Sequence, residues 1–148
     1  MEPAVNQSQT SSPQLIDAYL THQRLVSLAR ILLPTLIIII TTLALIPPEQ
    51  VPMASLGDKV LHAGAFFSLA ALVDTAFPNT GWSWKKFIGL TAYGLAIEIA
   101  QSFHPLRTFA LDDLVADMAG QGIYVILIPL FIRLPVTRLR WQQSTEKI

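Results

Sequence analysis

Charged and amide side chains gather in one segment of a chain that is otherwise mostly apolar. Residues 98–117 read EIAQSFHPLRTFALDDLVAD, and a shorter polar stretch, GDKVLH, occupies residues 57–62. Carboxylates close to an imidazole can transfer protons, recognise a charged ligand or bind a cation. The residues that could carry such chemistry are Asp58, Lys59, His62, Glu98, Gln101, His104, Arg107, Asp112, Asp113 and Asp117.

The spacing of these residues places them in pairs on single helix faces. Residues three or four apart are neighbours on a helix surface, and three pairs fit: Asp58 with His62, Glu98 with Gln101, and Asp113 with Asp117. An ionisable side chain that faces lipid costs at least about 2.5 kcal/mol. We therefore expect these pairs to face the interior of a helix bundle.

The elements that would position the pairs are apolar segments long enough to cross a bilayer. A crossing helix needs about 20 mainly apolar residues, and four segments qualify: 28–46, 60–77, 87–103 and 114–132. Short links containing proline separate them, which favours antiparallel neighbours in a compact bundle. The sequence predicts an all-α integral membrane four-helix bundle spanning 28–134. A polar N-terminal tail, 1–27, with a candidate interfacial helix at 14–27, and a basic C-terminal tail, 135–148, flank it.

Composition agrees with a membrane protein and excludes several functions. Of 148 residues, 52% are hydrophobic and only 14% are charged, against roughly 25% charged in soluble domains. Ten basic and ten acidic residues balance, so no overall charge favours nucleic acid as a partner. The absence of cysteine excludes disulfides, thiolate catalysis and cysteine-based zinc sites.

Basic residues predict the orientation. Cytoplasmic loops carry an excess of lysine and arginine, and with a cytoplasmic N-terminus only Lys59 and Arg107 would lie outside. The inner side would then hold Arg24, Arg30, Lys85, Lys86, Arg133, Arg138, Arg140 and Lys147. Both termini are predicted to be cytoplasmic, and the loops 47–59 and 104–112 to face outward.

This topology brings polar groups from three helices to one depth. At 1.5 Å per residue, His62, Glu98 and Asp117 would each lie about 6 to 9 Å inside the outer ends of their helices. Small residues that let helices approach closely support burial of these groups; they are Ala63, Gly64, Ala65, Ala92, Ala96, Ala100, Gly120 and Gly122.

Structural roles for the same residues remain open at this point. Asp58 and Asp112 have the positions of helix N-caps, and His62 could be a core histidine bonded to a carbonyl. Glu98 could lock helix packing through Arg107 or His62. Asp74 lies within reach of Lys85 and is assigned no functional role.

Metal binding is weighed and not expected. His62, Glu98 and Asp117 could supply two carboxylates and one imidazole, but no motif with metal-ligand spacing is present. We predict neither a metal nor another cofactor.

Four motifs in this order resemble the VanZ-like family of small bacterial membrane proteins. The motifs are D-K-x-x-H at 58–62, E-x-x-Q at 98–101, P-x-R at 105–107 and D-x-x-x-D-x-x-G at 113–120, and the similarity covers about residues 56–125. Asp117 departs from the pattern, because the family often has asparagine there. The resemblance implies a protein of the cell inner membrane and cell envelope, in a family named for a teicoplanin-resistance protein. The family's functional positions fall on Asp58, His62, Glu98, Gln101, Arg107 and Asp113.

Two functions follow from these residues. In the first, an outward-facing polar pocket binds a membrane lipid, a lipid-linked envelope component or another amphiphile, with Lys59 and Arg107 meeting anionic groups. Its role would be in envelope homeostasis or in glycopeptide or lipopeptide tolerance. In the second, an intramembrane enzyme uses Glu98 as general acid or base, His62 as proton shuttle and Arg107 to stabilise an oxyanion. Ion or proton permeation is a weaker third option, since the inner half offers few polar groups besides Asp74 and Tyr93.

Overall fold

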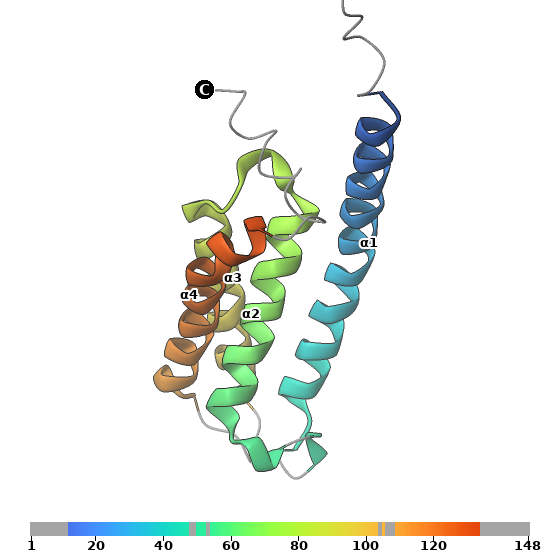
Figure 1. The fold of residues 1–148 in the computed structure, drawn as a ribbon. Helices are drawn as coiled ribbons and strands as arrows, with labels where there is room; N and C mark the ends of the chain where they lie inside the picture. The colour runs from blue at the N-terminus through green and yellow to red at the C-terminus, as the bar shows by residue number, and fades with distance from the viewer. Residues whose placement is uncertain (1–11, 48–49, 53, 104, 106–108, 134–148) are drawn as a thin grey trace, which may run out of the picture.

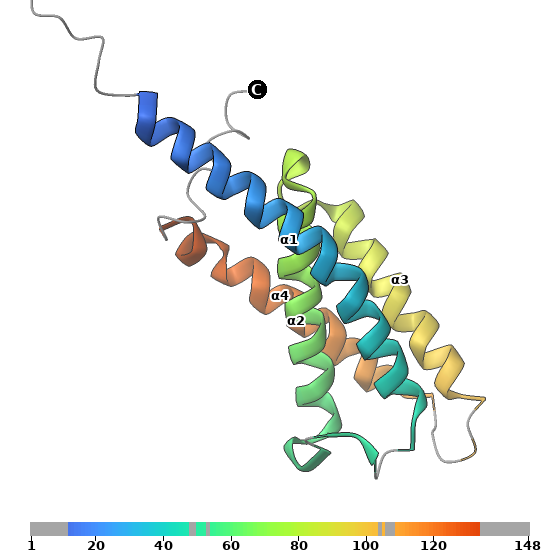
Figure 2. The same cartoon turned by 90° about the vertical axis from the view of Figure 1, so that its right-hand side faces the viewer.

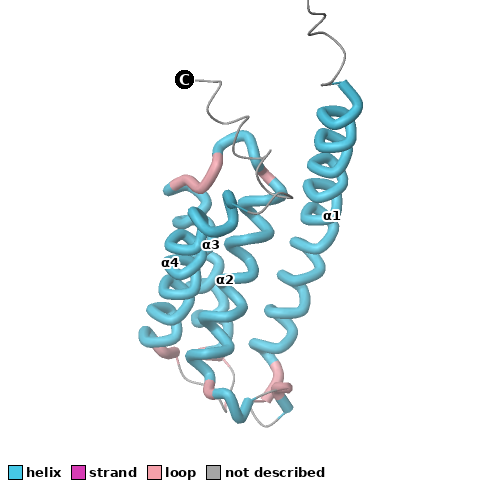
Figure 3. The backbone as a smooth tube through the Cα atoms, in the orientation of Figure 1, coloured by secondary structure: helices cyan, strands magenta, loops and turns pink. Residues whose placement is uncertain are grey.

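The computed structural model describes residues 12–47, 50–52, 54–103, 105 and 109–133, with the backbone alone for 12–19. All regular structure in these ranges is helical (Figure 3), which confirms the all-α prediction. The four α-helices are α1 (Ser12–Leu45), α2 (Asp58–Ala76), α3 (Trp84–Gln101) and α4 (Leu111–Arg133). Two short 3₁₀ turns, η2 (Ala54–Leu56) and η3 (Pro78–Thr80), lie in the links.

The helices run antiparallel to their neighbours in the chain. α2 lies between α1 and α4, and α1 begins at the end of the bundle where α4 ends (Figure 1). Figure 2 shows the long α1 crossing α2 at an angle. The first residues of α2 and α4 and the last residues of α3 therefore lie at one end of the bundle, where the sequence predicted that the polar groups would meet.

Helix α1 is continuous over 34 residues, a length of about 50 Å at 1.5 Å per residue. No break at residue 27 separates an interfacial helix from a membrane span. Pro34 lies within the helix, and its missing N–H removes one backbone hydrogen bond without ending the helix.

Within the described residues, three helices are long and apolar enough to cross a membrane: Leu20–Leu45 of α1, α2 and α4. Exposed isoleucines on α1 and α4, among them Ile31, Ile38 and Ile126, suit contact with lipid. The sequence also predicted a crossing for α3, but this helix carries Lys85, Lys86 and Glu98 within 18 residues, so length and composition alone do not qualify it.

Close packing between α2 and α4 depends on a glycine. A methyl group built on Gly120 would collide with the backbone carbonyl of Ala63, whereas one on Gly122 would meet nothing within 4 Å. A methyl group on Gly94 of α3 would likewise collide with Asp117. The predicted role of small residues in close helix approach is confirmed for Gly120 and wrong for Gly64 and Gly122, which have nothing within 4 Å of an added Cβ.

The apolar core lies at mid-height of the bundle. Its buried members are Phe66, Leu69, Ala70, Leu90 and Tyr124. The Tyr124 ring stands edge-on to Trp82 with 5.3 Å between centroids, an arrangement that aromatic pairs prefer. This core separates the polar groups at the two ends of the bundle.

The start of α2 sets the direction of the Asp58 side chain. Gly57 is the N-cap residue, with φ of 88°, in a region that glycine enters without steric cost. The Leu61 N–H donates to the Gly57 carbonyl at 3.2 Å. Asp58 is thus the first residue of the helix rather than its cap, and its carboxylate is available to the side chains beside it.

Candidate functional site

A histidine and an aspartate from different helices meet at the polar end of the bundle. His62 of α2 lies with its Nδ1 atom 2.8 Å from Oδ1 of Asp117 on α4. Asp117 is 1% exposed, so the pair is shielded from solvent. An ionised Asp117 accepts the Nδ1–H proton, which leaves Nε2 as the free ring nitrogen.

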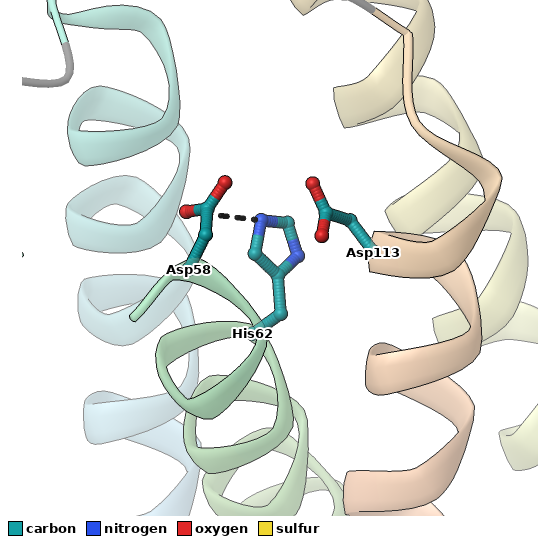
Figure 4. A group of neighbouring side chains, drawn as sticks. All are labelled: Asp58, His62 and Asp113. Atoms are coloured by element: carbon teal, nitrogen blue, oxygen red, sulfur yellow. Dashed lines mark ion pairs between the residues drawn. The ribbon is translucent and has the colours of Figure 1, made fainter. Parts of the chain in front are cut away.

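Two more carboxylates flank the imidazole. Figure 4 shows His62 between Asp58 and Asp113, with the ion pair to Asp58 dashed. The Nε2 atom lies 4.0 Å from Oδ1 of Asp58. One ligand atom from each of the three residues lies within 4.8 Å of the other two. Both predicted i,i+4 pairs therefore face the same region, as expected from their spacing.

Lys59 belongs to the surface of this cluster. It forms an ion pair with Asp112, and its Nζ atom is 4.0 Å from Oδ1 of Asp113. The Lys59 and Asp112 side chains are 62% and 61% exposed, so solvent screens their attraction. Lys59 offers a positive charge near the site but does not enter it.

Glu98 is buried, and it forms a hydrogen bond that the sequence did not predict. The side chain is 0% exposed, and Oε2 accepts the backbone N–H of Ala110 at 2.9 Å. Glu98 thereby ties the end of α3 to the start of α4. Among the described residues it forms no hydrogen bond or ion pair with His62, and the predicted link to Arg107 falls outside those residues. Its second oxygen, Oε1, is buried without a hydrogen-bond partner among the described residues, as is Oδ2 of Asp117.

Gln101 fixes α1 against α3. Its Nε2 atom donates to the Ala44 carbonyl at 3.0 Å, a hydrogen bond between the two helices. The amide also lines the pocket described next. Arg107 lies outside the described residues, and its predicted roles remain predictions.

A largely apolar pocket of about 470 Å³ lies beside the cluster, between α1 and α2. Its walls include Leu36, Ile40, Leu43, Ala65 and Phe66. The charged and amide residues of the lining are Asp58, His62 and Gln101, all from the polar end of the bundle. The sequence predicted an outward-facing polar pocket but not these apolar walls, because no motif in α1 signals them.

Sequence reasoning also missed a buried polar network at the opposite end. Asp74, 0% exposed, accepts the Tyr124 hydroxyl at 2.6 Å and lies 2.8 Å from Lys86 Nζ. Lys86 also donates to the Phe77 carbonyl at 2.8 Å. The sequence signal for this network was Asp74 within an apolar segment. The partner predicted for it was Lys85, which is exposed.

The arrangement at the first end supports two kinds of chemistry. The imidazole of His62, held by Asp117, can exchange a proton with a group placed at Nε2. The same imidazole and the Asp58 and Asp113 carboxylates can also bind a hydrogen-bond donor or a cation. Both uses require only side chains that the fold already brings together.

Comparison with known proteins identifies the family. The VanZ/LLP1 profile matches residues 4–132, nearly the whole chain. The chain belongs to the VanZ/LLP1 family. The match is wider than the motif region at 56–125 and includes α1. In this VanZ/LLP1 protein, α1 supplies one wall of the pocket.

A relative of this VanZ/LLP1 protein occurs in Schizosaccharomyces pombe. It is an uncharacterized protein that is 32% identical over 114 residues, which cover 73% of this chain and 67% of the relative. No solved structure matches the chain.

Proposed function

We propose that this VanZ/LLP1 protein binds a membrane amphiphile in the pocket between α1 and α2. The apolar tail would lie along the walls formed by Leu36, Ile40 and Phe66, and the polar head would meet Asp58 and His62. The observation that carries the proposal is that the apolar walls and both polar residues line the same pocket.

The size and chemistry of the pocket suit such a ligand. Its volume of about 470 Å³ falls in the range of about 300 to 1,000 Å³ typical of small-molecule sites. Such sites are mostly apolar, with a few polar groups that orient the ligand. Asp58 accepts hydrogen bonds and His62 offers Nε2, so a head rich in hydroxyl or amine donors fits this end directly.

The membrane setting is part of the proposal. We place the protein in the inner (plasma) membrane with both termini cytoplasmic, the pocket near the outer surface, and α3 as a fourth crossing helix. Roles in envelope homeostasis and in glycopeptide or lipopeptide tolerance are supported by the family resemblance. Because a relative occurs in Schizosaccharomyces pombe, we favour a lipid of general occurrence over a component peculiar to bacterial envelopes.

A photoactivatable probe tests the binding proposal. Purified full-length protein in lipid nanodiscs would be irradiated with a monoacylglycerol that carries a diazirine in its tail, and labelled peptides would be mapped by mass spectrometry. We expect labelling of the pocket-facing residues of α1 and α2 that excess unlabelled monoacylglycerol suppresses. Uniform labelling of the exposed α1 and α4 surfaces, unchanged by competitor, would contradict the proposal.

A matched pair of variants sharpens this test. Gly64 lines the pocket, and neither Gly64 nor Gly122 of α4 has an atom within 4 Å of an added Cβ. Gly64→Leu should fill the pocket and remove the competed labelling. Gly122→Leu adds the same volume outside the pocket lining and should leave labelling as in the parent protein.

An intramembrane acid/base enzyme is the second candidate. Oε1 of buried Glu98, which has no hydrogen-bond partner in the part of the chain that the structure describes, and the shielded His62–Asp117 pair support it, because both are placed for proton transfer away from bulk water. Glu98→Gln keeps the side-chain shape, His62→Asn keeps a polar group near the position of Nδ1, and both remove proton exchange. Lipid mass spectrometry of a deletion strain complemented with each variant would show a missing or accumulated lipid if a reaction occurs.

A further inference from the structure

We propose that Asp58, His62 and Asp113 form a binding site for one divalent transition-metal ion at the polar end of the bundle. Two carboxylates and one imidazole converge there, with one ligand atom of each within 4.8 Å of the others. Figure 4 shows the imidazole directed between the two carboxylates. This inference goes beyond the binding of an amphiphile and stands without it.

His62 is already oriented as a metal-ligating histidine would be. Such histidines donate their other ring N–H to a carboxylate, which fixes the tautomer and makes the free nitrogen a better ligand. Asp117 fills that position, with Oδ1 2.8 Å from Nδ1. The remaining nitrogen, Nε2, faces Asp58 at 4.0 Å, where its lone pair would meet a cation.

Among the described residues, the buried carboxylates near His62 are not matched by an equal number of positive charges. Asp113 is 8% exposed, and the charge recorded opposite its carboxylate is Lys59 at 4.0 Å, too far for a hydrogen bond. Oε1 of Glu98 and Oδ2 of Asp117 are also buried without hydrogen-bond partners among the described residues. A positive charge nearby stabilises ionised buried carboxylates, and a divalent ion would supply that charge.

The donor set indicates the class of metal. Imidazole suits Zn²⁺, Cu²⁺, Fe²⁺ and Ni²⁺, whereas Mg²⁺ and Ca²⁺ prefer oxygen ligands alone. Ligands about 2.0 to 2.2 Å from zinc lie about 3.4 Å apart in a tetrahedron, so the present separation needs small side-chain rotations. The Asp58 side chain is 57% exposed and free to make them. Three protein ligands leave a coordination position open toward the pocket that Asp58 and His62 line.

Metal titration of the full-length protein tests the inference. After treatment with a chelator, protein in detergent micelles would be titrated with Zn²⁺, and with Mg²⁺ for comparison, by calorimetry. Co²⁺ would be added separately to record visible d–d absorption. We expect saturable one-to-one Zn²⁺ binding, Co²⁺ bands typical of mixed nitrogen and oxygen ligation, and no comparable Mg²⁺ binding.

Variants assign the binding to the named ligands. His62→Asn and Asp113→Asn should abolish both the Zn²⁺ heat and the Co²⁺ bands. Asp117→Asn should retain the bands and weaken binding about 10- to 100-fold, the usual effect of losing an orienting carboxylate. Asp112→Asn is the matched control, because Asp112 neighbours Asp113 but pairs with Lys59 at the surface; its binding should equal that of the parent.

The outcomes separate clearly. Circular dichroism and gel filtration would establish that each variant is folded. If a variant at a buried position does not fold, Asp58→Asn, at an exposed position in the first turn of α2, would be tested in its place. No saturable Zn²⁺ or Co²⁺ binding by the parent protein would overturn the inference. Parent-like binding by folded His62→Asn or Asp113→Asn protein would overturn it as well.

Discussion

His62 on α2 and Asp117 on α4 are joined by a 2.8 Å contact between Nδ1 and Oδ1, across 55 residues of sequence. Because the pair is shielded and directly bonded, we expect the two side chains to contribute to stability together. A double-mutant cycle with His62→Ala and Asp117→Ala should give a coupling free energy of about 0.5 to 3 kcal/mol. Unfolding of purified protein in mixed micelles would measure it. The cycle of His62 with exposed Asp112 should give a value near zero, and equal coupling in both cycles would contradict the structure.

The second prediction concerns the crossing of α2 and α4. Gly120→Ala places a methyl group against the Ala63 carbonyl, so the helices must separate. We expect a loss of about 1 to 3 kcal/mol in the free energy of unfolding. Gly122→Ala, on the same helix with open space around its Cβ, should be neutral or slightly stabilising. Thermal unfolding of the two variants side by side would decide, and equal losses would refute the close crossing.

The third prediction concerns the network at the opposite end. Lys86→Met removes the amine 2.8 Å from fully buried Asp74 and leaves that carboxylate without this ion pair. Breaking a buried ion pair from one side typically costs about 3 to 5 kcal/mol. Lys85→Met removes the same charge from an exposed neighbouring position and should change the free energy of unfolding by less than about 0.5 kcal/mol. Chemical unfolding of both variants provides the comparison.

The fourth prediction separates the structural role of Glu98 from any catalytic one. Glu98→Ala leaves the Ala110 N–H, now bonded at 2.9 Å, without its acceptor, which should cost about 1 to 3 kcal/mol. Glu98→Gln keeps a carbonyl oxygen at that position and should retain most of the stability. Hydrogen exchange at Ala110 would report the bond directly: exchange should accelerate in Glu98→Ala and stay slow in Glu98→Gln. Slow exchange in both would show that Glu98 is not the acceptor.

Much of the fold could be predicted from the pattern of apolar and polar residues in the sequence. Apolar segments bounded by proline and glycine predicted 60–77 and 114–132, and the helices are Asp58–Ala76 and Leu111–Arg133. The i,i+4 spacing at the starts of α2 and α4, together with the antiparallel topology, was enough to predict that His62 and Asp117 lie in the same region. These inferences use only helix periodicity and the cost of placing charge in lipid.

The details that were missed depend on geometry that periodicity does not contain. Adjacent helix residues point about 100° apart, so a choice between Lys85 and Lys86 as the partner of Asp74 turns on the exact rotation of α3. The hydrogen-bond donor to Glu98 depends on the path of the chain into α4, where the backbone N–H of Ala110 takes this role. The pocket depends on the angle at which α1 crosses α2, which the sequence of α1 alone does not determine.

The rim of the pocket has a consequence for ligand delivery. Ile39, Leu56 and Val60 line the pocket and are also exposed apolar side chains, so its opening is framed by surface that would contact acyl chains. A ligand would then arrive by lateral diffusion within the leaflet. Occupancy would follow the mole fraction of that amphiphile in the bilayer and would respond little to its aqueous concentration, which makes the protein suited to sense or buffer the lipid composition around it.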